Sequence, residues 1–313
     1  MYIEHILLEG NRMEKNIPEF LKENLINQYK EEKSQEIVKG YSKNRKTTLR
    51  INTSKTSVEN VKRILDNEKI KYNEVSWYPK ALIIENVTEI DIKRLNIYEK
   101  GEIYLQSLSS MIPAIVLNPK AGENILDMAA APGGKTTQMA NLSNNKSMIT
   151  ACEKNKIRSE RLKYNLEKQG ANHVNIMIED ARKLSDFFSF DKILLDAPCS
   201  GSGTININDC KIQRYYTEEL VKRSIKTQKE LLMKASKIIK REGEIIYSTC
   251  SVLKEENEEV VEEVMKKADL ELVKIDNSMF KGIPLLPTKL EGTLCIQPNE
   301  LYEGFFVAKL KKK

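Results

Sequence analysis

Two cysteines stand where this sequence predicts that strands end. Cys199 closes Asp196-Ala-Pro-Cys199, and Cys250 closes Ser248-Thr-Cys250. A thiolate is a good nucleophile for covalent catalysis, and an acidic group such as Asp196 can stabilise charge that builds up during a reaction. Cysteine is also a common small buried residue, so one such position alone is weak evidence. The two positions together indicate thiol chemistry.

An attacking thiol needs help to ionise, since a free cysteine has a pKa of about 8.5 and is only a few per cent thiolate at neutral pH. We therefore expect the nucleophile to lie near a positive charge or the start of a helix, and Lys135 is a candidate neighbour. These residues alone do not choose between Cys199 and Cys250.

The segment from Asn124 to Thr137 predicts a strand, a tight turn and a helix, because an apolar run ends in small residues and Gly133-Gly134. Glycines let a ligand approach the backbone, and the amides at the helix start face it. One interpretation is a phosphate-binding loop, since Gly134-Lys135-Thr136 matches the end of G-x-x-x-x-G-K-[ST]. However, Ala129 replaces the first glycine, and Pro132 stiffens the loop.

The other interpretation is the first turn of a dinucleotide-like α/β fold that binds an adenosine-containing cofactor. Such a fold places an acidic residue at the end of the next strand, roughly 20 residues on, to hold the ribose hydroxyls. Glu153 fits that position, and Asp127 and Asp180 end two further predicted strands. Because parallel strands open onto one crevice, we expect these acids and Asp196 to meet there.

Predicted strands and helices alternate after residue 100, which indicates an α/β fold with a doubly wound, mostly parallel sheet. Residues 1–100 predict a helix and a small α+β module, and residues 101–313 predict the main domain. The module's predicted elements are a helix at Glu14–Lys33, a strand at Thr47–Asn52, a helix at Ser57–Asn67, and strands at Tyr72–Val75 and Ala81–Glu85. In the main domain, Glu271–Ile275 and Gly304–Leu310 are expected to form a hairpin at one edge.

The composition is that of a globular protein, with 40% hydrophobic residues and a net charge of +6. The apolar runs are too short for a membrane span and the N-terminus lacks the order of a secretion signal, so we expect a soluble, cytoplasmic protein. We also expect it to be a monomer. Five cysteines without metal spacing and only two histidines agree with a reducing compartment and predict no metal site.

Three polar segments have a structural and a functional interpretation. A basic run without acidic residues could contact phosphate or could be a solvated surface: Lys39, Lys43, Arg45, Lys46, Arg50 and Lys55. A second group could contact an unpaired nucleotide or could decorate a loop: Lys211, Arg214, Tyr215 and Tyr216. An acidic helix face is expected to be solvated: Glu255, Glu256, Glu258, Glu259, Glu262 and Glu263.

From about Leu49 to Leu310 the sequence resembles the Nop/Sun family of RNA cytosine-5 methyltransferases. Five stretches carry the resemblance: Leu49-Arg-Ile-Asn52, Tyr104-Leu-Gln-Ser-Leu-Ser-Ser-Met-Ile-Pro113, Asp127-Met-Ala-Ala-Ala-Pro-Gly-Gly-Lys-Thr136, Asp196-Ala-Pro-Cys-Ser-Gly-Ser-Gly203 and Ser248-Thr-Cys-Ser251. The resemblance implies a Rossmann-like class I methyltransferase domain with S-adenosylmethionine as cofactor. Many members carry two arginines soon after Pro-Cys; here Asn206 and Ile207 occupy that place, so RNA contacts there are expected to differ.

The resemblance also implies binding roles. S-adenosylmethionine would be surrounded by the residues of the glycine turn: Ala129, Ala130, Ala131, Pro132, Gly133, Gly134 and Lys135. Glu153 would hold the ribose, Asp180 the adenine side, and Asp196 the floor of the pocket near the methyl donor and the target base.

Cytosine chemistry explains why two thiols and an acid are needed. Carbon 5 is too poor a nucleophile to take a methyl group unaided, so a thiolate must first add at carbon 6. The resemblance favours Cys250 for this attack and Cys199 for release of the methylated product. Asp196 is expected to stabilise charge on the ring, with Lys135 beside the thiols.

RNA is the expected partner. Ribosomal RNA comes first, because Gln106–Pro113 looks most like the bacterial small-subunit branch of the family, and tRNA comes second. Two other classes stay open, a P-loop NTPase and a catalytically silent RNA-binding protein.

Overall fold

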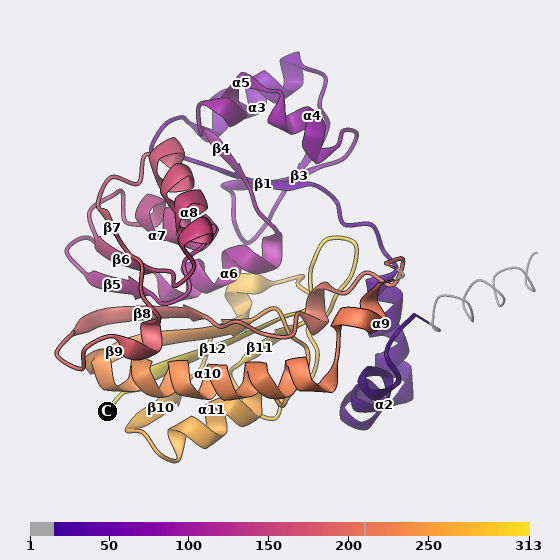
Figure 1. Ribbon diagram of the computed structural model, residues 1–313. Coiled ribbons are helices and arrows are strands. Elements are labelled where there is room, and N and C mark those ends of the chain that lie inside the picture. Colours follow the sequence, from indigo (N-terminus) through magenta and orange to yellow (C-terminus); the bar gives the residue numbers. More distant parts are fainter. Residues whose placement is uncertain (1–15, 210) are drawn as a thin grey trace, which may run out of the picture.

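The structure, a computed structural model, describes residues 16–209 and 211–313. It contains a four-stranded sheet and an eight-stranded sheet, which lie one above the other in the view of Figure 1. The first two residues of the predicted helix at Glu14–Lys33 fall outside the described part.

The small sheet is antiparallel, with strand order β2-β3-β1-β4. Its strands are β1 (Thr48–Ile51), β2 (Tyr72–Glu74), β3 (Ala81–Ile84) and β4 (Ile103–Leu105), and its helices are α3 (Val58–Asn67), α4 (Glu89–Lys93) and α5 (Asn96–Glu99). The Ser57 hydroxyl accepts a hydrogen bond from the Asn60 amide, so α3 begins at the predicted cap. Val61 and Leu65 of α3 pack in the same buried cluster as Leu49 and Ile51 of β1.

The two parts are interleaved along the chain. Strand β4 follows residue 100, yet it pairs with β1 and extends the small sheet. Helix α2 (Glu19–Tyr41) precedes β1, yet its apolar residues, such as Leu21 and Leu25, pack in the core cluster of the large sheet. The division at residue 100 therefore stays a prediction, with one element on each side that packs with the other part.

The large sheet has the order β10-β12-β9-β8-β5-β6-β7, and β11 pairs with β12. The parallel strands are β5 (Asn124–Asp127), β6 (Met148–Cys152), β7 (Val174–Met177), β8 (Phe190–Asp196) and β9 (Ile239–Thr249). The antiparallel strands are β10 (Leu270–Val273), β11 (Leu294–Ile296) and β12 (Phe305–Lys312). Segments 271–275 and 304–310 do pair, but β12 lies between β9 and β10, so only β10 is at the edge.

Helices cover both faces of the large sheet (Figure 1). Helices α6 (Leu108–Leu117), α7 (Gly134–Leu142) and α8 (Lys156–Gln169) lie on the face toward the small sheet, and α10 (Glu218–Ile238) and α11 (Glu258–Met265) lie on the other. The short elements are η1 (Ala181–Lys183), η2 (Ser202–Thr204), α9 (Ile212–Tyr215) and η3 (Asn277–Phe280). The predicted doubly wound α/β fold is confirmed.

This topology decides where a site can form. The carboxyl ends of β5, β6, β7, β8 and β9 lie at one edge, since these strands run parallel. Within residues 16–209 and 211–313, no helix has both the length and the hydropathy of a membrane span.

Candidate active site

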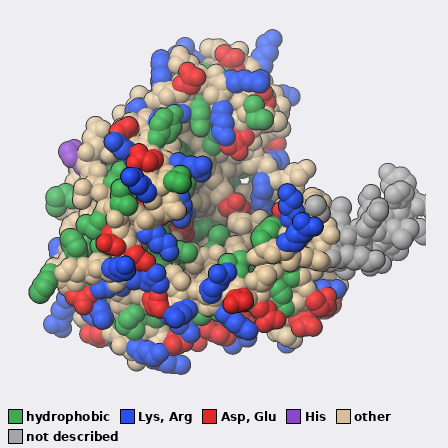
Figure 2. Space-filling model, viewed as in Figure 1, with side chains coloured by type: hydrophobic (Ala, Val, Ile, Leu, Met, Phe, Trp, Pro, Cys, Tyr) green, Lys and Arg blue, Asp and Glu red, His purple; other side chains and the backbone are tan. Residues whose placement is uncertain are grey.

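A cleft of about 330 Å³ opens at the carboxyl ends of β5, β8 and β9. Its lining includes Ala130 and Lys135 of the β5–α7 turn, Asp196 at the end of β8, Cys250 after β9, and Tyr104 of β4. Figure 2 shows this face of the molecule hollowed between its upper and lower parts. Residues that are far apart in sequence therefore share one cavity, and the small sheet contributes one of its walls.

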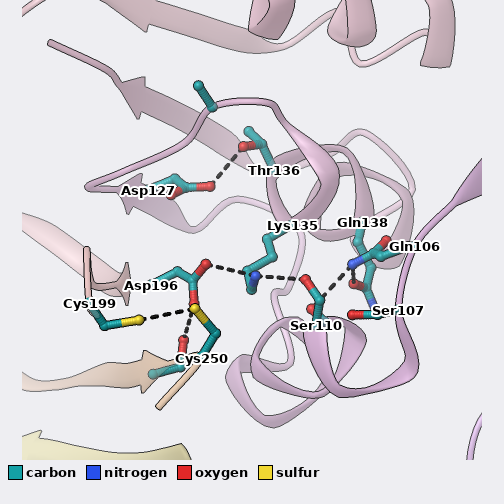
Figure 3. Close-up of polar contacts among 12 residues, drawn as sticks. Gln106, Ser107, Ser110, Asp127, Lys135, Thr136, Gln138, Asp196, Cys199 and Cys250 are labelled. Atoms are coloured by element: carbon teal, nitrogen blue, oxygen red, sulfur yellow. Dashed lines mark hydrogen bonds and ion pairs between the residues drawn. The ribbon is translucent and has the colours of Figure 1, made fainter. Parts of the chain in front are cut away.

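The two predicted thiols are direct neighbours. Cys199 Sγ and Cys250 Sγ lie 3.0 Å apart and share a hydrogen bond (Figure 3). Strand β8 is parallel to β9 and pairs Asp196 with Ser248, so the loops that follow the two strands run side by side. Both cysteines are half-buried, and neither is part of a disulfide.

Only Cys250 belongs to the lining of the 330 Å³ cleft, and Cys199 lies behind it. The hydrogen bond with Cys250, burial, and the negative charge of Glu256 raise the pKa of the Cys199 thiol well above its ordinary value. The arrangement presents Cys250 to a substrate in the cleft.

Asp196 is held by donors on both of its oxygens. Lys135 Nζ lies 2.7 Å from Asp196 Oδ2, and Ser248 Oγ donates to Asp196 Oδ1 at 2.7 Å. Lys135 Nζ also donates to Ser110 Oγ at 2.7 Å and lies 5.3 Å from the centre of the Phe305 ring. An acid and a base are thus fixed on the cleft wall beside Cys250, as Figure 3 shows.

The β5–α7 turn places most of its predicted ligand-binding residues on this cleft. The lining includes Ala129, Ala130, Ala131, Pro132, Gly134 and Lys135. Gly133 is the exception, since it faces α8, where a Cβ would come within 2.9 Å of Leu162 Cδ1. Its φ of 105° is one that side chains disfavour, so Gly133 shapes the turn and does not line the cavity.

Asp127 lies at the base of the same turn and is almost completely buried. Its Oδ2 accepts a hydrogen bond of 2.7 Å from Thr136 Oγ1 (Figure 3). Burial raises the pKa of Asp127 to about 6, against the opposing effect of the Thr136 hydrogen bond. The ionised form of this buried carboxyl group would therefore be stabilised by a cationic ligand beside it.

A smaller pocket of about 40 Å³ continues from Ala129 to Glu153 and Asp180. Glu153 is buried, accepts a hydrogen bond from the Asn155 amide at 2.8 Å, and lies 3.5 Å from Arg158 Nη1. Arg182 binds Asp180 through Nε and Nη2, and this pairing lowers the pKa of Asp180 to about 2. Asp180 also caps η1, because its side chain accepts a hydrogen bond from the Arg182 amide. The same residue therefore caps a helix and lines the pocket.

A polar network that the sequence did not suggest connects the small sheet to the turn. Arg50 is fully buried, and it donates to Gln106 Oε1 at 3.1 Å and to Thr137 Oγ1 at 3.0 Å. Gln106 in turn donates to Gln138 Oε1 at 3.0 Å. The signal available beforehand was only that Arg50 and Gln106 lie in stretches that resemble the family.

The phosphate-contacting interpretation of the basic run is wrong for Arg50, which is completely buried, and is weakened for two further members of the run. Arg45 donates to the carbonyl of Asn299, and Lys46 is paired with Glu85 at 2.6 Å. Lys39 and Lys43 are exposed. A count of basic residues could not separate these cases, because it does not report which side chains point inward.

Two other surface predictions need correction. Tyr216 is buried and shares a hydrogen bond with Ser200 at 3.0 Å, so it is not a surface contact for a nucleotide; Lys211, Arg214 and Tyr215 are exposed. The acidic face is not uniformly solvated, since Glu256 and Glu258 are buried. The six glutamates do not form one helix face, because α11 begins only at Glu258, and Glu256, which precedes it, accepts hydrogen bonds from Ser200.

Comparison with known proteins decides the family. Residues 114–311 match the model of the 16S rRNA methyltransferase RsmB/F family, and residues 17–91 match the RsmF/B-like ferredoxin-like domain. The chain belongs to the RsmB/F methyltransferase family. The first match covers nearly all of the large sheet and the cleft residues from Asp127 onward, and the second match covers α2 and most of the small sheet.

Relatives within and around the family differ in the RNA that they are named for. The chain is 35% identical to a tRNA (cytosine(49)-C(5))-methyltransferase of Pyrococcus abyssi, over 85% of this chain and 88% of the relative. It is 34% identical to a ribosomal RNA small subunit methyltransferase F of Shewanella, over 85% of this chain but 56% of that relative. The chain thus spans little more than half of the length of this ribosomal RNA methyltransferase.

Solved structures support the same fold. A methyltransferase homolog from Pyrococcus horikoshii superposes with a TM-score of 0.82 at 30% identity, covering 95% of this chain and 96% of the other. NSun6 from the same organism, solved with SFG, superposes with a TM-score of 0.84 at 27% identity, covering 94% and 98%. The two-sheet architecture is therefore that of known members.

Proposed function

We propose that the protein transfers a methyl group from S-adenosylmethionine to carbon 5 of a cytosine in RNA. The observation that carries the proposal is the presence of Cys250 on the wall of the cleft, with a second thiol 3.0 Å behind it and the Asp196–Lys135 pair beside it. A P-loop NTPase does not need this pair of thiols, and its first glycine is missing here, with Ala129 in that place.

The residues around the cavity suit the cofactor. The short side chains of Ala129, Ala130 and Ala131 leave room beside the backbone, and the buried carboxylate of Asp127 is matched to a cationic amino group. Glu153 and Asp180, in the adjoining pocket, would hold the ribose and the adenine side. When bound, S-adenosylmethionine supplies an electrophilic methyl group on a sulfonium sulfur.

Cys250 would perform the covalent step. Its thiolate forms a bond to carbon 6 of the cytosine, and the electron pair of the carbon 5–carbon 6 double bond shifts onto carbon 5, which takes the methyl group. Asp196 lies on the same wall and would face ring nitrogen 3 and the exocyclic amine, where its carboxylate would hold a proton that nitrogen 3 takes from solvent and so neutralise the negative charge that thiolate addition places on the ring. A base then removes the proton from carbon 5, the double bond returns, and the bond between sulfur and carbon 6 breaks.

Cys199 would assist the last of these events. Either sulfur can be the donor in the hydrogen bond that joins them, and a proton on Cys199 would stabilise the Cys250 thiolate as that sulfur leaves carbon 6. These separate roles, attack by Cys250 and assistance of release by Cys199, agree with the exposure of Cys250 to the cleft and with the raised pKa of Cys199.

The small sheet would position the RNA, since β4 supplies Tyr104 and Leu105 to the cleft. Ribosomal RNA stays our first substrate class. The Pyrococcus abyssi relative, of which this chain covers 88%, is named for tRNA, which supports tRNA as the second candidate. We also expect a cytoplasmic monomer, which size-exclusion chromatography with light scattering tests.

Transfer of radiolabelled methyl groups from S-adenosylmethionine to ribosomal RNA and tRNA tests the proposal directly. Label should appear in 5-methylcytosine after nuclease digestion, and mapping the modified position identifies the RNA. Binding of RNA without any transfer would instead support a silent RNA-binding protein, and a thermal shift with ATP and Mg²⁺ alone would support an NTPase.

A further inference from the structure

The loop that carries Cys199 is held from three directions. The Glu256 carboxylate accepts hydrogen bonds from the Ser200 amide at 2.8 Å and from Ser200 Oγ at 2.6 Å. Gln228 of α10 donates to the Pro198 carbonyl at 3.0 Å, and Tyr216 shares a hydrogen bond with Ser200 Oγ at 3.0 Å. Both neighbours of Cys199 in the chain are therefore fixed.

Glu256 is the centre of this arrangement. It is 0% exposed, and Gln228 Nε2 is a further donor to its Oε1 at 3.2 Å. Within the part of the chain that the structure describes, the hydrogen-bond donors to its side chain come from Ser200 and Gln228, which are neutral. A buried carboxylate satisfied by neutral donors alone is costly to a fold, so a solvated-surface role does not explain it.

The position of Glu256 gives the two thiols different electrostatic surroundings. The charges that act on Cys199 include those of Cys250 and Glu256, and both raise its pKa; the phenols of Tyr216 and Tyr247 are also near it. On the other side, Cys250 shares the cleft wall with Lys135, which is paired with Asp196. The negative charge of Glu256 disfavours a second negative charge on Cys199, so a thiolate formed in this pair is better placed on Cys250, which lines the cleft.

We propose that Glu256 is a positioning residue that anchors the Pro198–Ser200 loop and directs ionisation of the thiol pair to Cys250, leaving Cys199 as the protonated hydrogen-bond donor. The inference rests on the proposed function for the roles of the two sulfurs in methyl transfer. The arrangement of charges itself is independent of RNA and of cofactor.

Alkylation of the free protein by iodoacetamide tests the inference. Initial rates at Cys199 and Cys250 are measured peptide by peptide by mass spectrometry between about pH 6 and pH 9.5, where thiols titrate. In the unmodified chain, Cys250 should react faster at neutral pH and should titrate at the lower pH. Faster reaction of Cys199 would overturn the inference without the need for any variant.

Glu256→Gln removes the charge while keeping the shape of the side chain. The preference for Cys250 should fall about tenfold, which is the effect of one pKa unit, and the pH profile of Cys199 should move toward lower pH. Glu262→Gln, with the same change of charge on α11, should keep the preference of the unmodified chain. An unchanged ratio in a folded Glu256→Gln protein would refute the role of the charge.

Ser200→Ala tests the anchoring by the Ser200 hydroxyl separately from the charge, because it removes the hydrogen bonds of Ser200 Oγ to Glu256 and Tyr216 and leaves the carboxylate in place. It should preserve the preference of iodoacetamide for Cys250 but lower turnover with RNA and let the covalent RNA adduct accumulate. Equal turnover in Ser200→Ala and the unmodified protein would refute an anchoring role of the Ser200 hydroxyl. Alkylation needs neither RNA nor S-adenosylmethionine. An alkylation result that refutes the role of Glu256 would therefore not refute the proposed methyl transfer, and an absence of methyl transfer would not refute the role of Glu256 in the thiol pair.

Discussion

Cys199 Sγ and Cys250 Sγ are 3.0 Å apart, although 51 positions separate them in the sequence. Parallel pairing of β8 with β9 produces this contact, because Asp196 lies opposite Ser248 and both strands continue into a loop that carries one thiol. The two sulfurs are therefore one chemical unit, in which ionisation of either member affects the other.

Substitution of each cysteine should give opposite results with RNA. Cys250→Ala should abolish covalent capture of RNA, because no sulfur is left on the cleft wall to add at carbon 6. Cys199→Ala should lose turnover and accumulate the adduct, because release from Cys250 is slowed. Denaturing gel electrophoresis of protein incubated with labelled RNA and S-adenosylmethionine separates the two outcomes.

Cys295→Ala is a matched control for the cysteine variants, since Cys295 is buried against Tyr29. It should neither abolish nor trap the adduct. An adduct that forms only when Cys199 is intact would reverse the roles of the two thiols.

Asp196→Asn should lower kcat by about 100-fold to 1000-fold, the usual effect of losing one group that stabilises a developing charge. The amide keeps the size of the side chain but loses the negative charge that holds Lys135 at 2.7 Å. Asp191→Asn changes the other end of β8, where the carboxylate pairs with Lys240, and should retain activity. Steady-state kinetics of both variants make the comparison, and similar kcat values for the two would exclude Asp196 from the chemistry.

The strand ends were predictable because their chemistry lies in the local pattern. Apolar segments that end at Asp127, Glu153 and Asp196 predict both the strand and the polar residue that follows it. A parallel sheet then brings such strand ends together whatever the lengths of the loops are. The glycine turn was predictable for the same reason. Its one misplaced member, Gly133, packs against Leu162, a residue on a different helix, and no local pattern contains that contact.

The buried charges were not predictable from local pattern. Arg50 and Glu256 each lie in a segment rich in charges of their own sign, where a solvated surface is the natural expectation. Their burial depends on partners far away in the chain, Gln106 and Thr137 for Arg50 and Ser200 for Glu256. Charge composition reports an average over a segment, whereas these two roles depend on one side chain that points inward.

Asp127 should make the stability of the free protein depend on pH. Burial raises its pKa from 3.8 to about 6, so between these values the folded state holds a proton that the unfolded chain has released. The free energy of unfolding therefore falls as the pH rises through that window, and the loss, about 3 kcal/mol at most, is complete above about pH 6. Asp127→Asn should unfold at a higher temperature than the unmodified protein at pH 7 and at a similar temperature at pH 4.

The same substitution should weaken cofactor binding, since the amide cannot pair with a cationic amino group. Calorimetric titration with S-adenosylmethionine measures the affinity of both proteins for the cofactor, and thermal unfolding measures their stability. A variant that is less stable than the unmodified protein at pH 7 would show that the Asp127 carboxylate is not strained by its burial.

Arg50→Met should lower stability, as expected for a buried side chain with a structural role. Arg50 of β1 donates to Gln106 and to Thr137 of α7, and these hydrogen bonds couple the small sheet to the helix that follows the glycine turn. Its Nη1 has no hydrogen-bond partner in the described part of the chain. We expect a lower unfolding temperature and an unchanged salt dependence of RNA binding. Loss of a phosphate contact would instead reduce the slope of log K against log salt by about 0.7 for single-stranded RNA. Lys43→Met, at an exposed position of the same run, is the control, and it should leave the unfolding temperature unchanged.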